Sequence, residues 1–273
     1  MVNVNPARRA VAALAAIGLS TLAVACGSSS NGSSSKTTSA PASTSSSTST
    51  AAASGGSTPT VFAAASLTKV FPKIDASAKY TFGGSGALQT QIEQGAPADV
   101  FAAASPKQPA ELYAKGMVDK PVVFASNTLV LIVPKGNPAH VTSVSDITKP
   151  GVKLVICNAT VPCGDYARGA FKNLGITTAA MKNVVSQTTD VTQTVAEVAT
   201  GQADAGFVYI TDAKAANGKV TVVSLPPQAK PHTKDVIAVV KAGKNQPAAM
   251  AFVAKVLSPQ GQATLQAAGF GRP

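Results

Sequence analysis

Short apolar runs alternate with amphipathic segments from about residue 59 to the end of the chain. The runs "TPTVFAAA", "KYTF" and "ADVFAAA" are each followed by a segment with helical spacing of its apolar residues. Alternating strands and helices are typical of a mainly parallel sheet with helices on its faces. The pattern therefore predicts an α/β fold.

A second α/β unit follows a longer apolar run, "NTLVLIVPKGNP". Strands are predicted at "VKLVIC", "NVV", "ADAGFVY" and "KVTVVSL", and helices at "GDYARGAFKNLG" and "DVTQTVAEVATG". The last segment, "NQPAAMAFVAKVLSPQGQATLQAAGF", predicts two helices divided at Pro259.

We expect two lobes, with the second inserted into the first. Lobe one is predicted at 59–126 plus 234–273, and lobe two at 127–233. Strands near 127–133 and 234–240 would cross between them. Two such crossings favour a hinge with a cleft between the lobes.

The first residues, 1–26, have the pattern of an export signal. Arg8 and Arg9 precede an apolar run that is short for a membrane span, and small residues lead to Cys26. The end of this segment resembles a bacterial lipoprotein signal, which implies lipidation of Cys26. An ordinary cleaved signal peptide is the alternative.

Residues 27–58 are rich in Ser and Thr, and Lys36 is their only charge. Because no apolar pattern repays the entropy of ordering, we predict a disordered tether. A tether suits a protein anchored by a lipid to the outer face of the cell membrane.

The charge and the cysteines agree with an exported protein. The net charge of +11 is spread over scattered Lys and Arg residues, so we expect no nucleic-acid partner, whereas attraction of anions is compatible with it. Cys157 and Cys163 flank a short turn-rich segment, and outside the cytoplasm a disulfide is favoured. A metal site and two free thiols are the alternatives.

Motifs of catalysis are missing from the sequence. The only histidines, His140 and His232, lie in Pro-rich connecting segments, and there is no G-x-S-x-G, H-E-x-x-H or phosphate-loop motif. The 12 acidic residues form no cluster that suggests a cation site. We therefore expect no enzyme, no cofactor and no direct metal-cation ligand.

Several predicted strands end in a small or polar residue where a helix starts, at Ser66, Ser85, Cys163 and Val191. Ligands of open α/β sheets bind at such strand ends. Helix starts have free N–H groups and a positive dipole end, so four of them converging would hold an anion without Arg or Lys. Each residue taken alone fits a simple helix cap equally well.

Four segments together resemble the molybdate-binding proteins of bacterial ABC importers. In order, they are "VFAAASLT", "FGGSGALQTQIEQGAPADVF", "NTLVLIVPKGNP" and "TTDVTQTVAEVATGQADAGFVYITDA", and the resemblance spans about 59–273. It implies the two-lobed periplasmic-binding-protein fold, a monomer, and an inner-membrane permease with its ATPase as partners. It also implies five ligand-binding residues: Ser66, Ser85, Cys163, Val191 and Tyr209.

Donor groups alone suit molybdate, which is a fully ionised dianion. A protonated phosphate would place donor against donor and lose a hydrogen bond, at a cost on the order of 1–3 kcal/mol. Tungstate nearly matches molybdate and is expected to bind, whereas donors alone cannot reject sulfate. The alternatives are a binding protein for another oxyanion such as sulfate, a sensor or adhesion module of the same fold, and a serine hydrolase.

The chain departs from the family pattern at three places. Cys163 stands where the family has Ala, "GSG" around Ser85 replaces "SSS", and Pro72 is expected to break the first helix early. The hexapeptide "VFAAAS" occurs twice. Its first copy ends in the family's ligand position, Ser66, whereas Ser105 precedes Pro106 and is expected only to cap a helix, with Gln108 as its capping-box partner.

Overall fold

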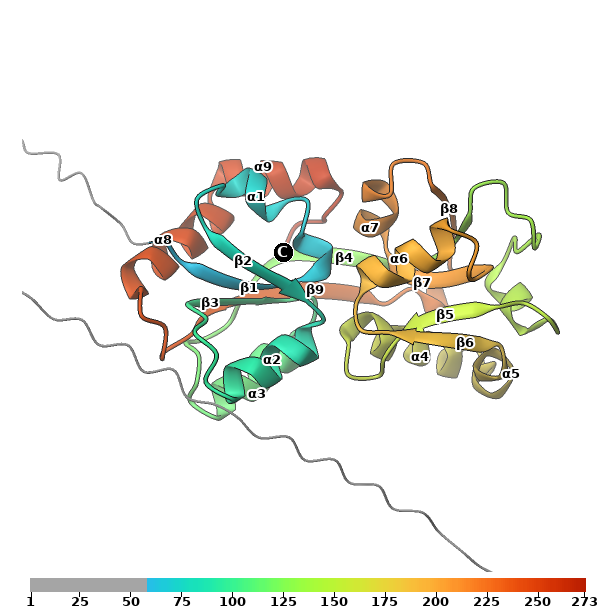
Figure 1. The fold of residues 1–273 in the computed structure, drawn as a ribbon, viewed down its shortest axis with the longest axis horizontal. Coiled ribbons are helices and arrows are strands. Elements are labelled where there is room, and N and C mark those ends of the chain that lie inside the picture. Colours follow the sequence, from blue (N-terminus) through green and yellow to red (C-terminus); the bar gives the residue numbers. More distant parts are fainter. Residues whose placement is uncertain (1–57) are drawn as a thin grey trace, which may run out of the picture. The chain divides into compact units, whose positions relative to one another are not determined.

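The structure, a computed structural model, describes residues 58–273. One nine-stranded sheet runs through them in the order β2-β1-β3-β9-β4-β7-β5-β6, and β8 pairs with β4 (Figure 1). The strands are β1 (Thr60–Ala64), β2 (Lys79–Gly83), β3 (Val100–Ala103), β4 (Val122–Pro134), β5 (Leu154–Cys157), β6 (Val184–Thr188), β7 (Ala205–Tyr209), β8 (Val220–Val223) and β9 (His232–Val239).

Two long strands join the two halves of the sheet. β1 pairs in parallel with β2 and β3, and β5 pairs in parallel with β6 and β7. Between these groups, β4 and β9 run antiparallel to each other, from Val122 opposite Ile237 to Thr128 opposite His232. The predicted α/β fold with two crossing strands is thereby confirmed, and the predicted lobe divisions fall inside β4 and β9.

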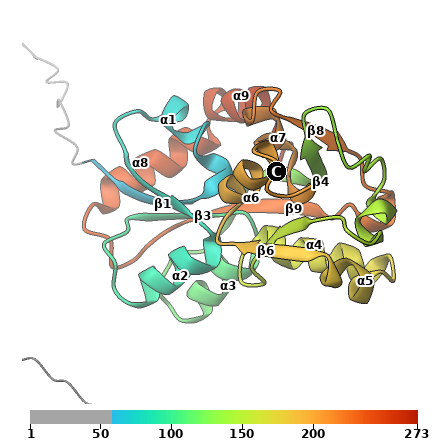
Figure 2. The ribbon, with the colours of Figure 1, turned by 45° about the vertical axis from the view of Figure 1, so that its right-hand side comes forward.

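Helices cover both faces of each half. We call β1–β3 with α1–α3, α8 and α9 lobe one, and β5–β8 with α4–α7 lobe two; Figures 1 and 2 show that α2 and α3 lie across the sheet from α1, α8 and α9, as α4 and α5 do from α6 and α7. The helices are α1 (Phe71–Ile74), α2 (Ser85–Glu93), α3 (Lys107–Ala114), α4 (Pro162–Asn173), α5 (Thr177–Lys182), α6 (Val191–Ala199), α7 (Ile210–Ala215), α8 (Gln246–Leu257) and α9 (Pro259–Ala268).

The core explains why the strands are almost entirely apolar. All residues of β3, β5 and β7 are buried, as expected for strands with helices on both faces. In lobe one the ring of Phe71 lies 5.8 Å from that of Phe124 and 5.5 Å from that of Phe252. In lobe two Phe171 and Phe207 pack edge to face at 5.2 Å.

The segment after β1 differs from the prediction. Ser66 lies in a short 3-10 turn, Ala65–Leu67, and a separate helix follows at Phe71–Ile74. Pro72 stands in the first turn of α1, where its missing N–H costs no hydrogen bond, so it begins a helix and does not break one. The helices α5 and α7 were not predicted, because both are short and directly follow stronger patterns.

The predicted signal at 1–26, the lipidated Cys26 and the tether up to residue 57 lie outside the described residues. Within 58–273 no helix is both long enough and apolar enough to cross a membrane.

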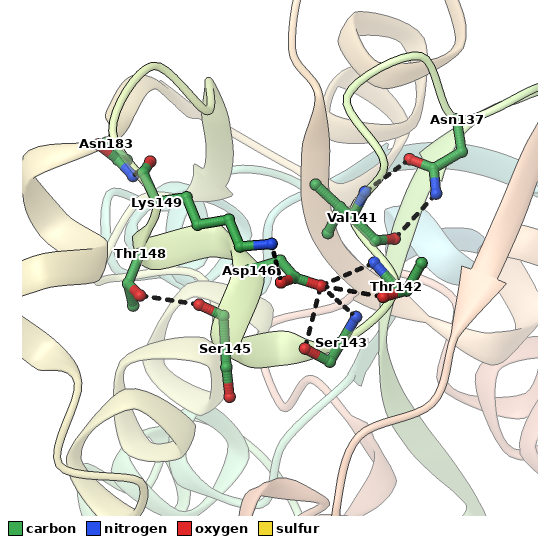
Figure 3. Close-up of polar contacts among 9 residues, drawn as sticks. All are labelled: Asn137, Val141, Thr142, Ser143, Ser145, Asp146, Thr148, Lys149 and Asn183. Atoms are coloured by element: carbon green, nitrogen blue, oxygen red, sulfur yellow. Dashed lines mark hydrogen bonds and ion pairs between the residues drawn. The ribbon is translucent and has the colours of Figure 1, made fainter.

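Asp146 organises the connection that follows β4. Its Oδ2 atom accepts hydrogen bonds from the backbone N–H groups of Thr142 at 2.9 Å and Ser143 at 2.8 Å, and from both hydroxyls (Figure 3). Its Oδ1 atom lies 2.6 Å from Nζ of Lys149. The Lys149 ammonium, with these donors, holds the pKa of the Asp146 carboxyl well below its ordinary value.

Candidate functional site

A small cavity lies between the two lobes. Its volume is about 10 Å³, and residues of both lobes line it. Pockets for drug-sized organic ligands run to about 300–1,000 Å³, so this cavity suits a small ion. All five residues that the sequence analysis selected line it: Ser66, Ser85, Cys163, Val191 and Tyr209.

The two serines come from the ends of neighbouring strands of lobe one. Because β1 and β2 are parallel, the turn with Ser66 and the start of α2 at Ser85 lie at the same edge of the sheet. The Oγ atom of Ser66 is buried and has no hydrogen-bond partner among the described residues. The Ser85 hydroxyl accepts from the Ala104 N–H at 3.2 Å, which leaves its own proton free to donate.

Cys163 is held at the second position of α4. A disulfide joins it to Cys157, the last residue of β5, and so ties the strand end to the helix start. The Arg168 guanidinium donates to the carbonyl oxygens of Cys157 at 2.9 Å and Gly164 at 3.0 Å. These bonds fix the loop that carries Cys163 to the cavity.

Val191 is the first residue of α6, after the N-cap Asp190. Asp190 also lines the cavity, and its Oδ1 atom accepts from the N–H groups of Thr192 at 2.8 Å and Gln193 at 3.1 Å. The cap therefore uses the second and third N–H groups of the helix. The N–H group of Val191 does not donate to this cap, so it is able to donate to a ligand.

Tyr209 closes the cavity from the end of β7. Only 1% of the residue is exposed, and its hydroxyl has no hydrogen-bond partner among the described residues. Burial, together with the charge of Asp235, raises its pKa well above the ordinary value. The side chain is therefore a neutral hydroxyl, able to donate, at physiological pH.

No Lys or Arg of the described residues lines the cavity. Two buried carboxyls lie nearby, and burial raises the pKa of Asp212 to about 7 and that of Asp235 well above its ordinary value. Protonation limits the repulsion that they exert on an anion. A neighbouring groove shares Ser66 and is lined by Lys69, Lys73 and Lys214.

Ser105, at the end of the second "VFAAAS", is not among the residues that line the cavity. Its hydroxyl oxygen accepts from the Lys107 N–H at 3.1 Å, and it shares a hydrogen bond with the Tyr166 side chain. The prediction that Ser105 caps this helix is wrong, because Pro106 is the N-cap of α3. The expected capping box does not form either, since Oε1 of Gln108 has no partner among the described residues. The two identical sequences thus end in different environments.

The sequence analysis missed several lining residues. Gly84 and Val161 flank the predicted ligand positions, and Asp190 is a recognisable N-cap, so proximity to a strand end was the available signal. Among residues 58–273, no group of three or more His, Cys, Asp or Glu residues is arranged to hold a metal ion.

The chain matches a family model and a curated relative over most of its length. The model for bacterial extracellular solute-binding proteins matches residues 52–271. The molybdate-binding protein ModA of Mycobacterium tuberculosis H37Rv is 39% identical over 223 residues, which cover 78% of this chain and 84% of the relative.

Two solved structures share the fold. The periplasmic molybdate-binding protein of Azotobacter vinelandii aligns with a TM-score of 0.69 at 23% identity, over 79% of this chain and 99% of the other. The sulfate-binding protein SubI of M. tuberculosis H37Rv aligns with a TM-score of 0.67 at 20% identity, over 78% and 86%. At such identities these structures bear on the fold alone.

Proposed function

Because the chain belongs to the bacterial extracellular solute-binding proteins and, within them, to the family of the molybdate-binding protein ModA, we propose that it captures molybdate for an ABC importer. The observation that carries the proposal is a pair of buried hydroxyls, on Ser66 and Tyr209, that have no hydrogen-bond partner within residues 58–273. They come from different lobes and line one small cavity. Buried polar groups are normally paired, and oxyanion oxygens would pair both.

Each of the five residues has a proposed donor. The hydroxyls of Ser66, Ser85 and Tyr209 and the backbone N–H groups of Cys163 and Val191 bind the oxygens of the anion. The starts of α2, α4 and α6 add the positive ends of three helix dipoles. Hydrogen bonds from neutral donors thus replace ion pairs.

The set of donors also predicts which oxyanions bind tightly and which bind weakly. Molybdate and tungstate are fully ionised and nearly equal in size, so both bind. Protonated phosphate is disfavoured because its hydroxyl meets donors. Sulfate binding is the runner-up function, since SubI has the same fold, but the curated relative with 39% identity is a molybdate-binding protein.

We further propose how the protein works in the cell. It is exported, lipid-anchored through Cys26 on the outer face of the cell membrane, and monomeric. The lobes close on the ion, since only closure brings the donors of both lobes to one anion. An inner-membrane permease with its ATPase then receives the ion. As a component of a transport system it has no catalytic role.

Isothermal titration calorimetry of the purified protein with molybdate, tungstate, sulfate and phosphate tests the ligand. We expect heat and tight binding with the first two anions and much weaker binding with phosphate. Tight binding of sulfate with no heat from molybdate would replace the proposal by the sulfate function. Incorporation of labelled palmitate into cells that express the wild type, and its loss in Cys26→Ser, tests the anchor.

A further inference from the structure

Two glycines of lobe one, Gly84 and Gly86, flank the proposed ligand residue Ser85. They are the "GSG" with which this chain departs from the "SSS" of its family. Both lie where lobe one meets lobe two. We propose that these glycines form a closure seam: a place where the absence of side chains lets the lobes approach closely enough to share one anion.

Lobe one itself does not require glycine at these positions. The backbone of Gly84 has φ −66° and ψ 133°, which any residue adopts, and it is the N-cap of α2. Gly86 lies within α2, where alanine is the better helix former by propensity. Neither residue has the positive φ that makes glycine necessary in a turn.

The reason for glycine lies in the other lobe. A Cβ atom on Gly84 would collide with the carbonyl oxygen of Thr189, and one on Gly86 with that of Thr160. Both contacts would be closer than the 3.0 Å that real Cβ atoms keep. The obstacles are backbone atoms, which cannot rotate away as the end of a long side chain does.

Other buried glycines of the described chain behave differently. A Cβ atom on Gly206 would meet Val198 and Val155, and one on Gly261 would meet Lys255 and Val256. Those neighbours belong to the glycine's own lobe. Such glycines serve the packing of one lobe, whereas Gly84 and Gly86 meet atoms of the opposite lobe.

The seam is part of the same surface as the site. Thr160 stands just before the start of α4, which presents Cys163, and Thr189 stands just before the cap of α6, which presents Val191. The backbone that meets the seam glycines therefore belongs to the loops that bring the lobe-two donors to Ser85. A methyl group in the seam would hold those donors back from an ion bound at Ser85.

This mechanism makes an unusual prediction for Gly86→Ala, and it rests on the proposed function. Without ligand we expect the lobes to move apart and leave room for the methyl group, and alanine adds helix propensity, so the unfolding temperature without ligand should stay equal or rise slightly. Molybdate should bind about tenfold or more weakly, since at least one hydrogen bond to a charged group is lost. If Gly86 served only the packing of the folded protein, its replacement by alanine would lower the unfolding temperature without ligand.

The experiment compares wild type, Gly84→Ala, Gly86→Ala and Gly169→Ala. Gly169 is the matched control, because it is also a helical glycine but has open space around its Cβ position. Unfolding temperatures are measured with and without molybdate, and affinities by calorimetry. Dyes introduced by unnatural amino acids at the exposed Met250 and Val185, one in each lobe, report closure by energy transfer.

We expect molybdate to raise the energy transfer and the unfolding temperature of wild type and Gly169→Ala, and to do so little or not at all in the two seam variants. If Gly86→Ala bound molybdate and closed as the wild type does, the proposed closure seam would be wrong, but the proposed function would stand. A lower unfolding temperature of both ligand-free seam variants would assign the glycines to folding instead. A wild type that binds none of the oxyanions would remove the proposed function and the seam with it.

Discussion

Two of the regions that bury polar side chains in this molecule treat them in opposite ways. In the connection after β4, each oxygen of Asp146 has partners, from Thr142, Ser143 and Lys149. In the cavity between the lobes, the hydroxyls of Ser66 and Tyr209 have none among the described residues. The first arrangement stabilises a loop.

The second arrangement, in the cavity, lowers the stability of the folded protein when no ligand is bound. A buried polar group without a partner costs about 1–3 kcal/mol, and the protein recovers that free energy only when a ligand supplies the partner. The contrast separates polar residues that stabilise the fold from those proposed to bind the anion. It also predicts that substitutions in the two regions will affect different measurements.

The largest effect is expected at the cavity. Ser66→Ala and Tyr209→Phe should each weaken molybdate binding roughly 10- to 100-fold, because each removes one hydrogen bond to an anion. The unfolding temperature without ligand should not fall, since neither hydroxyl has a partner to lose. Calorimetry and thermal unfolding measure the two quantities on the same samples.

Ser105→Ala is the matched control for Ser66→Ala, since both residues end the same hexapeptide. It should lower stability by about 1 kcal/mol, through loss of the hydrogen bonds that its hydroxyl shares with the Lys107 N–H and Tyr166, and leave the affinity for molybdate nearly unchanged. If Ser105→Ala weakened binding as much as Ser66→Ala, the cavity would not be the place of the anion.

Asp146→Asn should have the opposite outcome to the cavity variants. The amide retains one carbonyl oxygen but loses the charge that attracts Lys149, and its NH₂ group meets donors. We expect a lower unfolding temperature with unchanged affinity for molybdate. A loss of affinity without a loss of stability would show that the loop is coupled to the site.

The dependence of stability on pH should have opposite signs in the two regions. Burial raises the pKa of Asp212 to about 7, so the folded state keeps a proton that the unfolded state loses above the ordinary pKa of 3.8. Stability from this group therefore falls as the pH rises from about 4 to 7. The pKa of Asp146 is lowered, so its contribution is lost only in acid.

Asp235→Asn tests this behaviour. Burial raises the pKa of Asp235, and neither carboxyl oxygen has a partner in the described part of the chain, so no hydrogen bond seen there is lost. The variant should unfold at a higher temperature than wild type at pH 8, with a smaller difference at pH 5. An equal difference at both pH values would mean that Asp235 does not titrate in this range.

The smallest effect is expected from the basic groove beside the cavity. Lys69→Gln with Lys73→Gln removes two positive charges from the groove but no proposed donor of the site. Association with molybdate should slow a few-fold at low salt, and the difference should vanish at high salt. Stopped-flow kinetics measures this; a changed dissociation rate would place a lysine in contact with the ion.

The strands, the crossing pair and the strand ends were predictable because burial on both faces leaves a continuous apolar pattern. The grouping of Ser66, Ser85, Cys163, Val191 and Tyr209 followed from helix starts and from family motifs. The sequence showed Gly84 and Gly86 only as a departure from the family pattern. Their contacts with lobe two could not be predicted, because those neighbours lie more than 70 residues away in sequence. Pro72 was misjudged because proline ends one helix and begins another with equal ease.

The disulfide between Cys157 and Cys163 affects the charge of the loop beside the proposed anion site. A sulfur atom in a disulfide cannot ionise, so the loop beside the anion keeps the same charge at every pH. A free Cys163 thiol would be able to lose its proton and repel the dianion. We therefore expect the protein with both cysteines reduced to bind the anion less tightly than the oxidised protein, most of all at high pH.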